Sequence, residues 1–433
     1  MKDKVLLTSE YVITDQTGLL DEYAHGANNM YNAALYQVRQ AFFKHHKFFN
    51  YGELCKIFQK KYQQRECMVY HEVGYVQSAQ QTIKEVLNIW SCYFKALKVF
   101  YKNPSKFNGK PRMPRYLEKG NRHLFFVTNQ CAKNKNGYLV ISKLGIHLRL
   151  DQRVKKIKQV ALKPLSKQRF RIFVQYEVSD SVMKPDNGIY VGIDPGLDNA
   201  FTCVTNGNQH PLIINGKGPK SVNQYYNKQR AILSQKHAQY HQCCKTINTK
   251  QGVKTIYYDS QKMIQLTEWR NTKIKQFAHK ASKCIIDYAL SCDANTIVIG
   301  KNKNQKRSAN LGKRNNQNFI GIPHSMMINM IKYKAQQVGI NVIETNESYT
   351  SQTSFLDHEK PCKQNGNYAR QQKHLLPAKR RVKRGLFRSN NGTLINADVN
   401  GALQIIKKAF PKFDMNDGTV GLVLSPFKYS ITF

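Results

Sequence analysis

The sequence predicts two parts, a small β-barrel that carries a helical insertion and an α/β domain that follows it. Three observations lead to this prediction. Five short β-type segments lie between residues 106 and 180, and a sixth lies at residues 3–15. A long helical pattern separates the sixth from the other five. After residue 188 the order is strand, hairpin, helices, strand, helix, strand, helix, which is typical of an α/β fold.

The helical block is recognised by the spacing of its apolar residues. Tyr31, Leu35, Val38 and Phe42 recur at intervals of three and four residues, so they line one face of a helix. Prolines and a glycine in KNPSKFNGKPRMPRY end this pattern. The predicted domains are a wedge-like barrel of residues 1–27 and 106–180, an inserted helical recognition domain of residues 28–105, a linker at 179–188, an α/β domain of residues 188–410 and a C-terminal tail of residues 411–433.

The charge of the chain points to a polyanionic partner. Lys and Arg total 68 against 27 acidic residues, so the formal net charge is +41. Self-repulsion of this size disfavours a compact state unless a polyanion neutralises it, and nucleic acid does so with release of counterions. We expect no membrane partner, because no apolar run approaches about 18 residues. The ten cysteines form no C-x-x-C pair, which favours reduced thiols in a cytoplasm, close to the nucleoid.

Two aspartates are the first candidate site residues. Asp194 ends the apolar strand at residues 189–193, where an ionised carboxylate is costly unless a positive charge compensates it. Asp398 lies in the first turn of a predicted helix. A turn-capping role for Asp194 and a helix-dipole role for Asp398 are the simpler explanations. Together, in so basic a chain, they resemble the acid pair of RNase H-like nucleases, in which three or four carboxylates hold two Mg²⁺ ions.

A longer series of motifs resembles one family. The motifs are GIDPGLDNAFTCVTN, YYNKQRAILSQK, HKASKCIIDYA, IPHSMMINMIKYKAQQVGINV, ESYTSQTS and NADVNGALQI. In this order they resemble TnpB, the OrfB-type protein of bacterial and archaeal insertion sequences, from about residue 188 to residue 410. The resemblance implies a RuvC-type, RNA-guided DNA endonuclease. It also implies a guide RNA made from the transposon end, and cutting of double-stranded DNA beside a short transposon-adjacent motif.

The third carboxylate departs from the usual pattern of that family. Typical members end the strand that corresponds to residues 296–300 with a catalytic glutamate, but this chain has Gly300 there. The next strand carries Glu344 and Glu347, and the resemblance to a subgroup with IGKN and ESYTS implies that the glutamate has moved to it. We predict Glu347, just past the strand end, as the third metal ligand beside Asp194 and Asp398. Glu344 is the alternative.

A second departure concerns the zinc ribbon that many relatives carry. The interval before NADVN contains only Cys362, so a thiolate zinc site is not expected. We predict a basic insertion at residues 352–392 in its place, because residues 360–390 hold ten Lys or Arg and no acid. The residues predicted to contact nucleic acid are Lys110, Arg112, Arg115, Lys301, Lys303, Arg307, Arg314, Arg380, Arg381 and Arg384.

The resulting hypothesis is a DNA endonuclease that uses Mg²⁺ or Mn²⁺ and no zinc. One alternative is an RNA-guided DNA-binding regulator that has lost cleavage, and another is a compact type V CRISPR-like effector. A strand-transfer transposase would use the same carboxylates but would need transposon-end binding domains, for which the sequence shows no motif.

Overall fold

The computed structural model divides into two compact units, residues 1–180 and residues 181–433. It describes residues 4–166, 168–179, 181–249, 252–301, 317–318, 320–348, 350–360, 380–383, 385–415 and 417–432. The predicted contact residues Lys303, Arg307, Arg314 and Arg384 lie outside the described residues, as does Cys362. None of the described helices is both long and apolar enough to cross a membrane.

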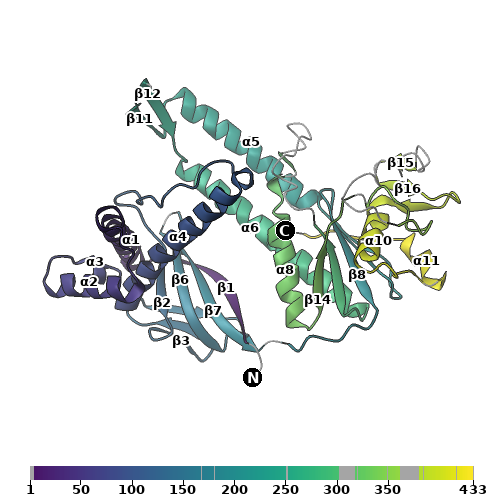
Figure 1. Ribbon diagram of the computed structural model, residues 1–433, viewed down its shortest axis with the longest axis horizontal. Coiled ribbons are helices and arrows are strands. Elements are labelled where there is room, and N and C mark those ends of the chain that lie inside the picture. The colour runs from purple at the N-terminus through teal and green to yellow at the C-terminus, as the bar shows by residue number, and fades with distance from the viewer. Residues whose placement is uncertain are drawn as a thin grey trace. The chain divides into compact units, whose positions relative to one another are not determined.

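The first unit combines two antiparallel sheets with a group of helices between its first two strands (Figure 1). One sheet has four strands in the order β1-β7-β6-β2, and the other has three in the order β3-β4-β5. The strands are β1 (Lys4–Thr14), β2 (Phe125–Thr128), β3 (Ala132–Lys135), β4 (Tyr138–Ile141), β5 (Ile146–Arg149), β6 (Lys156–Pro164) and β7 (Arg169–Ser179). The predicted β-type segments correspond to β1, β2, β4, β5, β6 and β7, whereas β3 was not predicted. The closure of these strands into a barrel stays a prediction.

The helices of this unit bury the apolar stripe that the spacing predicts. Tyr31, Leu35 and Val38 of α1 are at most 5% exposed. The helices are α1 (Leu19–His45), α2 (Tyr51–Gln63), α3 (Val69–Glu72) and α4 (Val76–Lys102), with a short 3₁₀ turn at Pro104–Lys106. The helical region begins at Leu19 rather than at residue 28, because the buried Asp15 carboxylate accepts the backbone N–H groups of Gly18 and Asp21 and so starts the helix earlier.

The second unit is a mixed α/β layer structure around a six-stranded sheet of order β14-β13-β8-β9-β10-β18 (Figure 1). The first three strands in sequence form an antiparallel meander, and β13 and β14 then pair in parallel beside β8. The strands are β8 (Tyr190–Pro195), β9 (Asn199–Thr205), β10 (Leu212–Asn215), β13 (Thr296–Gly300), β14 (Asn341–Thr345) and β18 (Phe427–Tyr429). Residues that we expected in a C-terminal tail thus supply β18, which pairs with β10.

Helices cover the two faces of this sheet. Val191, Ile193, Ile297 and Ile299 share a core with α6 (Gln261–Ser291) and α8 (His324–Gln337). On the other face, Val204 and Ile213 share a core with α10 (Ala397–Ala409). Two further helices of this unit are α5 (Lys217–Gln239), which packs on α6, and α11 (Asp417–Val423). Figure 1 shows the hairpin of β11 (Cys244–Thr249) and β12 (Gly252–Tyr257) at the end of α5 and α6 that lies away from the sheet.

A small three-stranded sheet of the second unit precedes α10 in the chain. Its strands are β15 (Arg381–Lys383), β16 (Leu386–Arg388) and β17 (Leu394–Asn396), in the order β15-β16-β17. The last residue of β17, Asn396, is also the N-cap of α10, since its side chain accepts the N–H groups of Asp398 and Val399. The described parts of the predicted basic insertion therefore include a hairpin that leads directly into the helix of Asp398.

Candidate active site

Asp194 lies near the end of β8, on the face of the sheet that α10 covers. Side chains alternate between the two faces of a strand. Val191 and Ile193 point to the α6 and α8 side, so Asp194 points to the α10 side. By the same alternation Ile297 and Ile299 face α6 and α8, and Gly300 ends β13 on the side of Asp194.

Glu347 fills the space that Gly300 leaves open. The chain leaves β14 at Thr345, and a Cβ atom added at Gly300 would lie 3.1 Å from both the Cβ and the Oε2 atoms of Glu347. The Thr350 N–H and hydroxyl both donate to the Glu347 carbonyl, at 3.2 and 2.8 Å. The Lys408 ammonium of α10 donates to the Ser348 carbonyl at 2.9 Å. These bonds hold the loop in a conformation that brings the Glu347 carboxylate to the end of β13.

Asp398 reaches the same edge of the sheet from the first turn of α10. Its Oδ2 atom accepts a hydrogen bond of 2.6 Å from the Asn199 side chain, which belongs to β9. One turn further along α10, a Cβ atom added at Gly401 would lie 3.0 Å from Asp194 Oδ2. The lack of a side chain at Gly401 therefore lets α10 approach Asp194 closely, so that strand and helix present their carboxylates to one region.

The electrostatics of Asp194 connect the three carboxylates. Burial raises the pKa of Asp194 well above its usual value, and the negative charges of Glu347 and Asp398 raise it further, while Arg381 of β15 acts in the opposite direction. A buried acid whose ionisation is disfavoured by two neighbouring carboxylates is typical of a site for a cation. Among the described residues, no three His, Cys, Asp or Glu side chains are close enough together to hold a metal ion. Carboxylate oxygens are the donors that Mg²⁺ and Mn²⁺ prefer, so the three acids would be the candidate ligands of such an ion.

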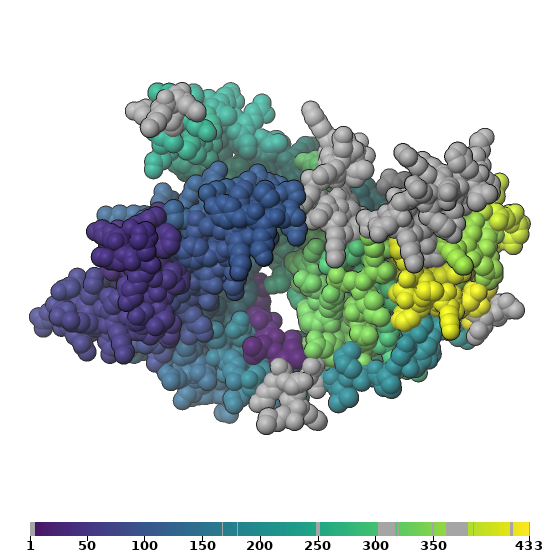
Figure 2. All heavy atoms as spheres, viewed as in Figure 1, coloured from purple at the N-terminus to yellow at the C-terminus, as the bar shows by residue number. Residues whose placement is uncertain are grey.

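Glu344, the alternative third acid, is engaged elsewhere. It forms ion pairs with Lys301 and Lys332, at 2.9 and 2.7 Å. Burial raises the pKa of Glu344, but these two ammonium groups outweigh it and lower the pKa overall. Figure 2 shows the part of the chain that carries β14 (green) beside the part that carries α10 (yellow), and these two elements contact each other. Of the two glutamates, Glu347 is the one that lies beside Gly300.

The predicted contact residues fall into different surroundings. Lys110, Arg112 and Arg115 are exposed in an irregular segment of the first unit. Lys301 pairs with Glu344. Arg380 is largely buried against Asp357 and Glu359, whereas Arg381 lies on the exposed β15 and acts on Asp194.

Two residues of the site, Asn199 and Gly401, were not predicted from the sequence, although both lie in motifs that were. Asn199 stands in the same motif as Asp194, five residues later, and Gly401 follows Asp398 by three residues. Each has a role that depends on an element distant in sequence: Asn199 bonds to α10, and Gly401 faces β8. Their motifs marked the region, but only the fold shows what each residue contacts.

Two family models match the chain between residues 173 and 405. Residues 173–306, which include Asp194 and Gly300, match a family described as a probable transposase, OrfB_IS605. Residues 324–405, which include Glu347 and Asp398, match the TNB domain of Cas12f1-like proteins. No curated protein matches the chain.

Solved structures similar to the chain include two Cas12f assemblies. A Cas12f1–sgRNA–target DNA complex is 16% identical, with 94% of this chain and 100% of that chain covered and a TM-score of 0.35. A CRISPR-Cas12f ternary complex is 15% identical, with 92% and 82% covered and a TM-score of 0.33.

Proposed function

We propose that this chain, whose two family matches confirm the predicted resemblance to TnpB-type proteins, is an RNA-guided DNA endonuclease of an insertion sequence. It would hydrolyse phosphodiester bonds in double-stranded DNA that pairs with a guide RNA from the transposon end, beside a short adjacent motif. The observation that carries this proposal is the approach of Asp194, Glu347 and Asp398 to one edge of the sheet, with Glu347 in the space beside Gly300.

The strand order of the second unit supports an RNase H-like domain. A meander of three antiparallel strands, followed by two strands added in parallel beside the first, is the arrangement expected of that fold. In such a domain the first acid lies on the first strand and a late acid on a helix beside it, as Asp194 and Asp398 do.

The carboxylates define what the site would bind. Asp194, Glu347 and Asp398 would hold Mg²⁺ or Mn²⁺, which when bound activates water and stabilises the leaving oxygen of a phosphodiester. Asn199 keeps the Asp398 carboxylate oriented through its 2.6 Å hydrogen bond. Arg381 places positive charge near Asp194, where a backbone phosphate would approach. The exposed Lys110, Arg112 and Arg115 of the first unit would contact guide RNA or the DNA duplex through phosphates.

The experiment that tests this function begins with the RNA that the protein carries. The full chain is purified from a cell that also expresses the flanking transposon end, and its bound RNA is sequenced. The complex is then incubated with Mg²⁺ and a plasmid library that carries the matching target beside randomised flanks. We expect linear plasmids enriched in one flank. A bound RNA with specific target binding but intact plasmids would favour the alternative of a guided DNA-binding regulator.

A CRISPR-like origin of the guide is distinguished by the same sequencing. Repeat-derived RNA in place of transposon-end RNA would assign the chain to a compact type V effector. Joining of transposon ends to the plasmid, instead of linearisation, would identify a strand-transfer transposase.

A further inference from the structure

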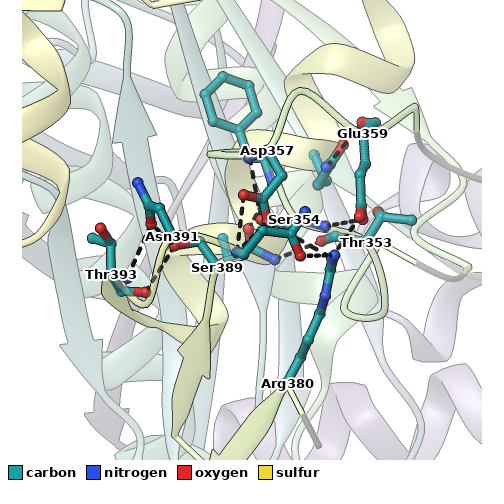
Figure 3. Close-up of polar contacts among 12 residues, drawn as sticks. Thr353, Ser354, Asp357, Glu359, Arg380, Ser389, Asn391 and Thr393 are labelled. Carbon is teal, nitrogen blue, oxygen red and sulfur yellow. Dashed lines mark hydrogen bonds and ion pairs between the residues drawn. The ribbon is translucent and has the colours of Figure 1, made fainter. Parts of the chain in front are cut away.

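A largely buried ion-pair cluster joins the loop of residues 353–359 to the segment that begins at Arg380. Both segments precede α10 in the chain. The Arg380 guanidinium is 9% exposed, and its Nη1 atom lies 2.6 Å from Glu359 Oε1 and 3.8 Å from Asp357 Oδ2. We call these three residues the Arg380 clip. Figure 3 shows Arg380 reaching from the end of one segment toward the loop that holds Thr353, Ser354, Asp357 and Glu359.

Both acids of the clip also bind backbone, so the clip fixes main chain on each side. Glu359 Oε2 accepts the Ser354 N–H at 2.7 Å, which closes the loop on itself. Asp357 accepts the Asn390 N–H with both oxygens, each at 3.0 Å. The Arg380 carbonyl accepts the Arg388 N–H at 2.8 Å. The loop of residues 353–359 is therefore tied to the hairpin that leads into α10.

The same loop is tied to α10 itself. The Asn400 side chain, which is completely buried, accepts the Phe355 N–H at 2.9 Å and donates to the Thr353 carbonyl at 2.8 Å. Gln404, one turn later, donates to the Glu359 carbonyl at 3.3 Å. Asn400 follows Asp398 by two residues. The first turn of α10 thus meets Asp194 and Asn199 on one side and the clipped loop on another.

The clipped loop also continues from Glu347. Only residues 348–352 separate Glu347 from Thr353, and the Thr350 N–H and the Lys408 ammonium fix that short connection. The segment therefore has a candidate metal ligand at its start and the clip at its end. Between them, it is attached to the helix that carries Asp398. Movement of residues 353–359 would be transmitted to both carboxylates.

Stability alone gives a weak reason for such a cluster. Replacing a buried ion pair by apolar residues is often neutral or stabilising, because the charges lose hydration on burial. The carboxylates of Asp357 and Glu359 also accept directional hydrogen bonds from backbone N–H groups, and these specify one geometry, which an apolar contact does less well. A positioning role accounts for the three backbone N–H groups, of Ser354, Asn390 and Arg388, that the clip residues bind.

We propose that the Arg380 clip is a positioning device for the candidate active site. By holding residues 353–359 against α10, it fixes the Glu347 loop and the Asp398 helix relative to each other. This inference rests on the proposed function, since it assumes that these carboxylates hold a divalent ion. Groups that orient metal ligands from behind typically change metal affinity or activity by about 10–100-fold when they are replaced.

The test measures metal binding directly in the full chain with its RNA. Mn²⁺ binding is followed by electron paramagnetic resonance, and the signal of the Asp194→Ala variant is subtracted as the contribution of RNA and surface sites. The variants are Arg380→Met, and Arg380→Met combined with Glu359→Gln, which leaves no unpaired glutamate behind. Arg230→Met is the control, because it breaks a more exposed ion pair, between Arg230 of α5 and Asp259, the residue two positions before α6.

We expect both Arg380 variants to bind Mn²⁺ about 10–100-fold more weakly than wild type, with Arg230→Met unchanged. Amide hydrogen exchange at Ser354 and Phe355 should quicken in parallel, and guide-RNA binding should persist. If Arg380→Met does not fold, the double variant carries the test.

Two contrary results separate the two claims. Wild-type Mn²⁺ affinity in a folded double variant, whatever its thermal stability, would overturn the positioning role and leave the carboxylate site intact. Equal Mn²⁺ binding by wild type and Asp194→Ala would instead overturn the metal site of the proposed function.

Discussion

Replacing Gly300 by alanine tests whether Glu347 occupies the place of an absent side chain. The added methyl group would lie 2.5 Å from Ile405 Cδ1 and 3.1 Å from both Cβ and Oε2 of Glu347. Ile405 Cδ1 is the end of a flexible side chain and can rotate away. The Glu347 Cβ is fixed by the backbone of a hydrogen-bonded loop, so the loop itself must give by a few tenths of an ångström.

The size of the effect follows from these contacts. Overpacking of this kind costs about 1–3 kcal/mol of stability. A misplacement of about 1 Å at a catalytic group costs roughly 10²-fold in rate, so a shift of a few tenths predicts a loss of about 3–10-fold for Gly300→Ala. Gly300→Val fills more of the space that Glu347 uses, and we expect it to lose about 10²-fold or more.

The assay is single-turnover cleavage of a guide-matched duplex at saturating Mg²⁺, with RNA and target binding measured alongside. Gly421→Ala is the control, because the Cβ position there has no atom within 4 Å apart from the neighbouring residues and the backbone of its own helix. A graded loss from alanine to valine, at constant binding affinity, supports the placement of Glu347. Wild-type cleavage by Gly300→Val would refute it, since the carboxylate could not then be needed beside Gly300.

The other predictions concern the ligands, the metal and the charged pair beside the site. Asp194→Ala and Asp398→Ala should abolish cleavage but keep guide-RNA and target binding, because basic contacts supply the affinity; loss of RNA binding in either variant would mark it as structural. Cleavage should require Mg²⁺ or Mn²⁺, and elemental analysis should find no tightly held zinc. A result of one zinc ion per chain would contradict the expectation about zinc. Glu344→Gln should lower the free energy of unfolding by about 0.5–1 kcal/mol near pH 7. The Lys301 and Lys332 ammonium groups lower the pKa of Glu344 in the folded state, so this contribution is present above the unfolded-state pKa and shrinks as the pH falls through the folded-state value. A difference in denaturation midpoint that stays constant with falling pH would rule out this origin.

The candidate site could be predicted from the sequence where chemistry and local pattern coincide. Asp194 follows an apolar strand and Asp398 follows a capping residue, so each was placed on its element without the fold. The position of Glu347 beside Gly300 was implied by the resemblance to a TnpB subgroup, together with the rule that parallel strands end at the same edge of a sheet. Gly300 was the useful signal, because typical members of that family have a glutamate there.

The rest depended on contacts that no local pattern encodes. β18 has only three residues, all exposed, and becomes a strand by pairing with β10 more than 200 residues earlier. The early start of α1 depends on a single capping carboxylate, Asp15. Sequence alone gives Arg380 as one more cation in a basic insertion, whereas its burial depends on two acids that precede it by about twenty residues in the chain. Composition predicts the sign of the net charge of a segment, but it does not predict which of the charged side chains are buried.

The measurement that tests the central claim most directly is single-turnover cleavage by Glu347→Gln beside Glu344→Gln. The two glutamates are three residues apart, and the substitution keeps the size of each side chain while removing its charge. The proposed site predicts that Glu347→Gln loses at least about 10³-fold in cleavage rate with target binding intact, as expected for loss of an essential group. It predicts that Glu344→Gln cuts at nearly the wild-type rate. Normal cleavage by Glu347→Gln, or an inactive Glu344→Gln that still binds its target, would contradict the assignment of Glu347 as the third carboxylate.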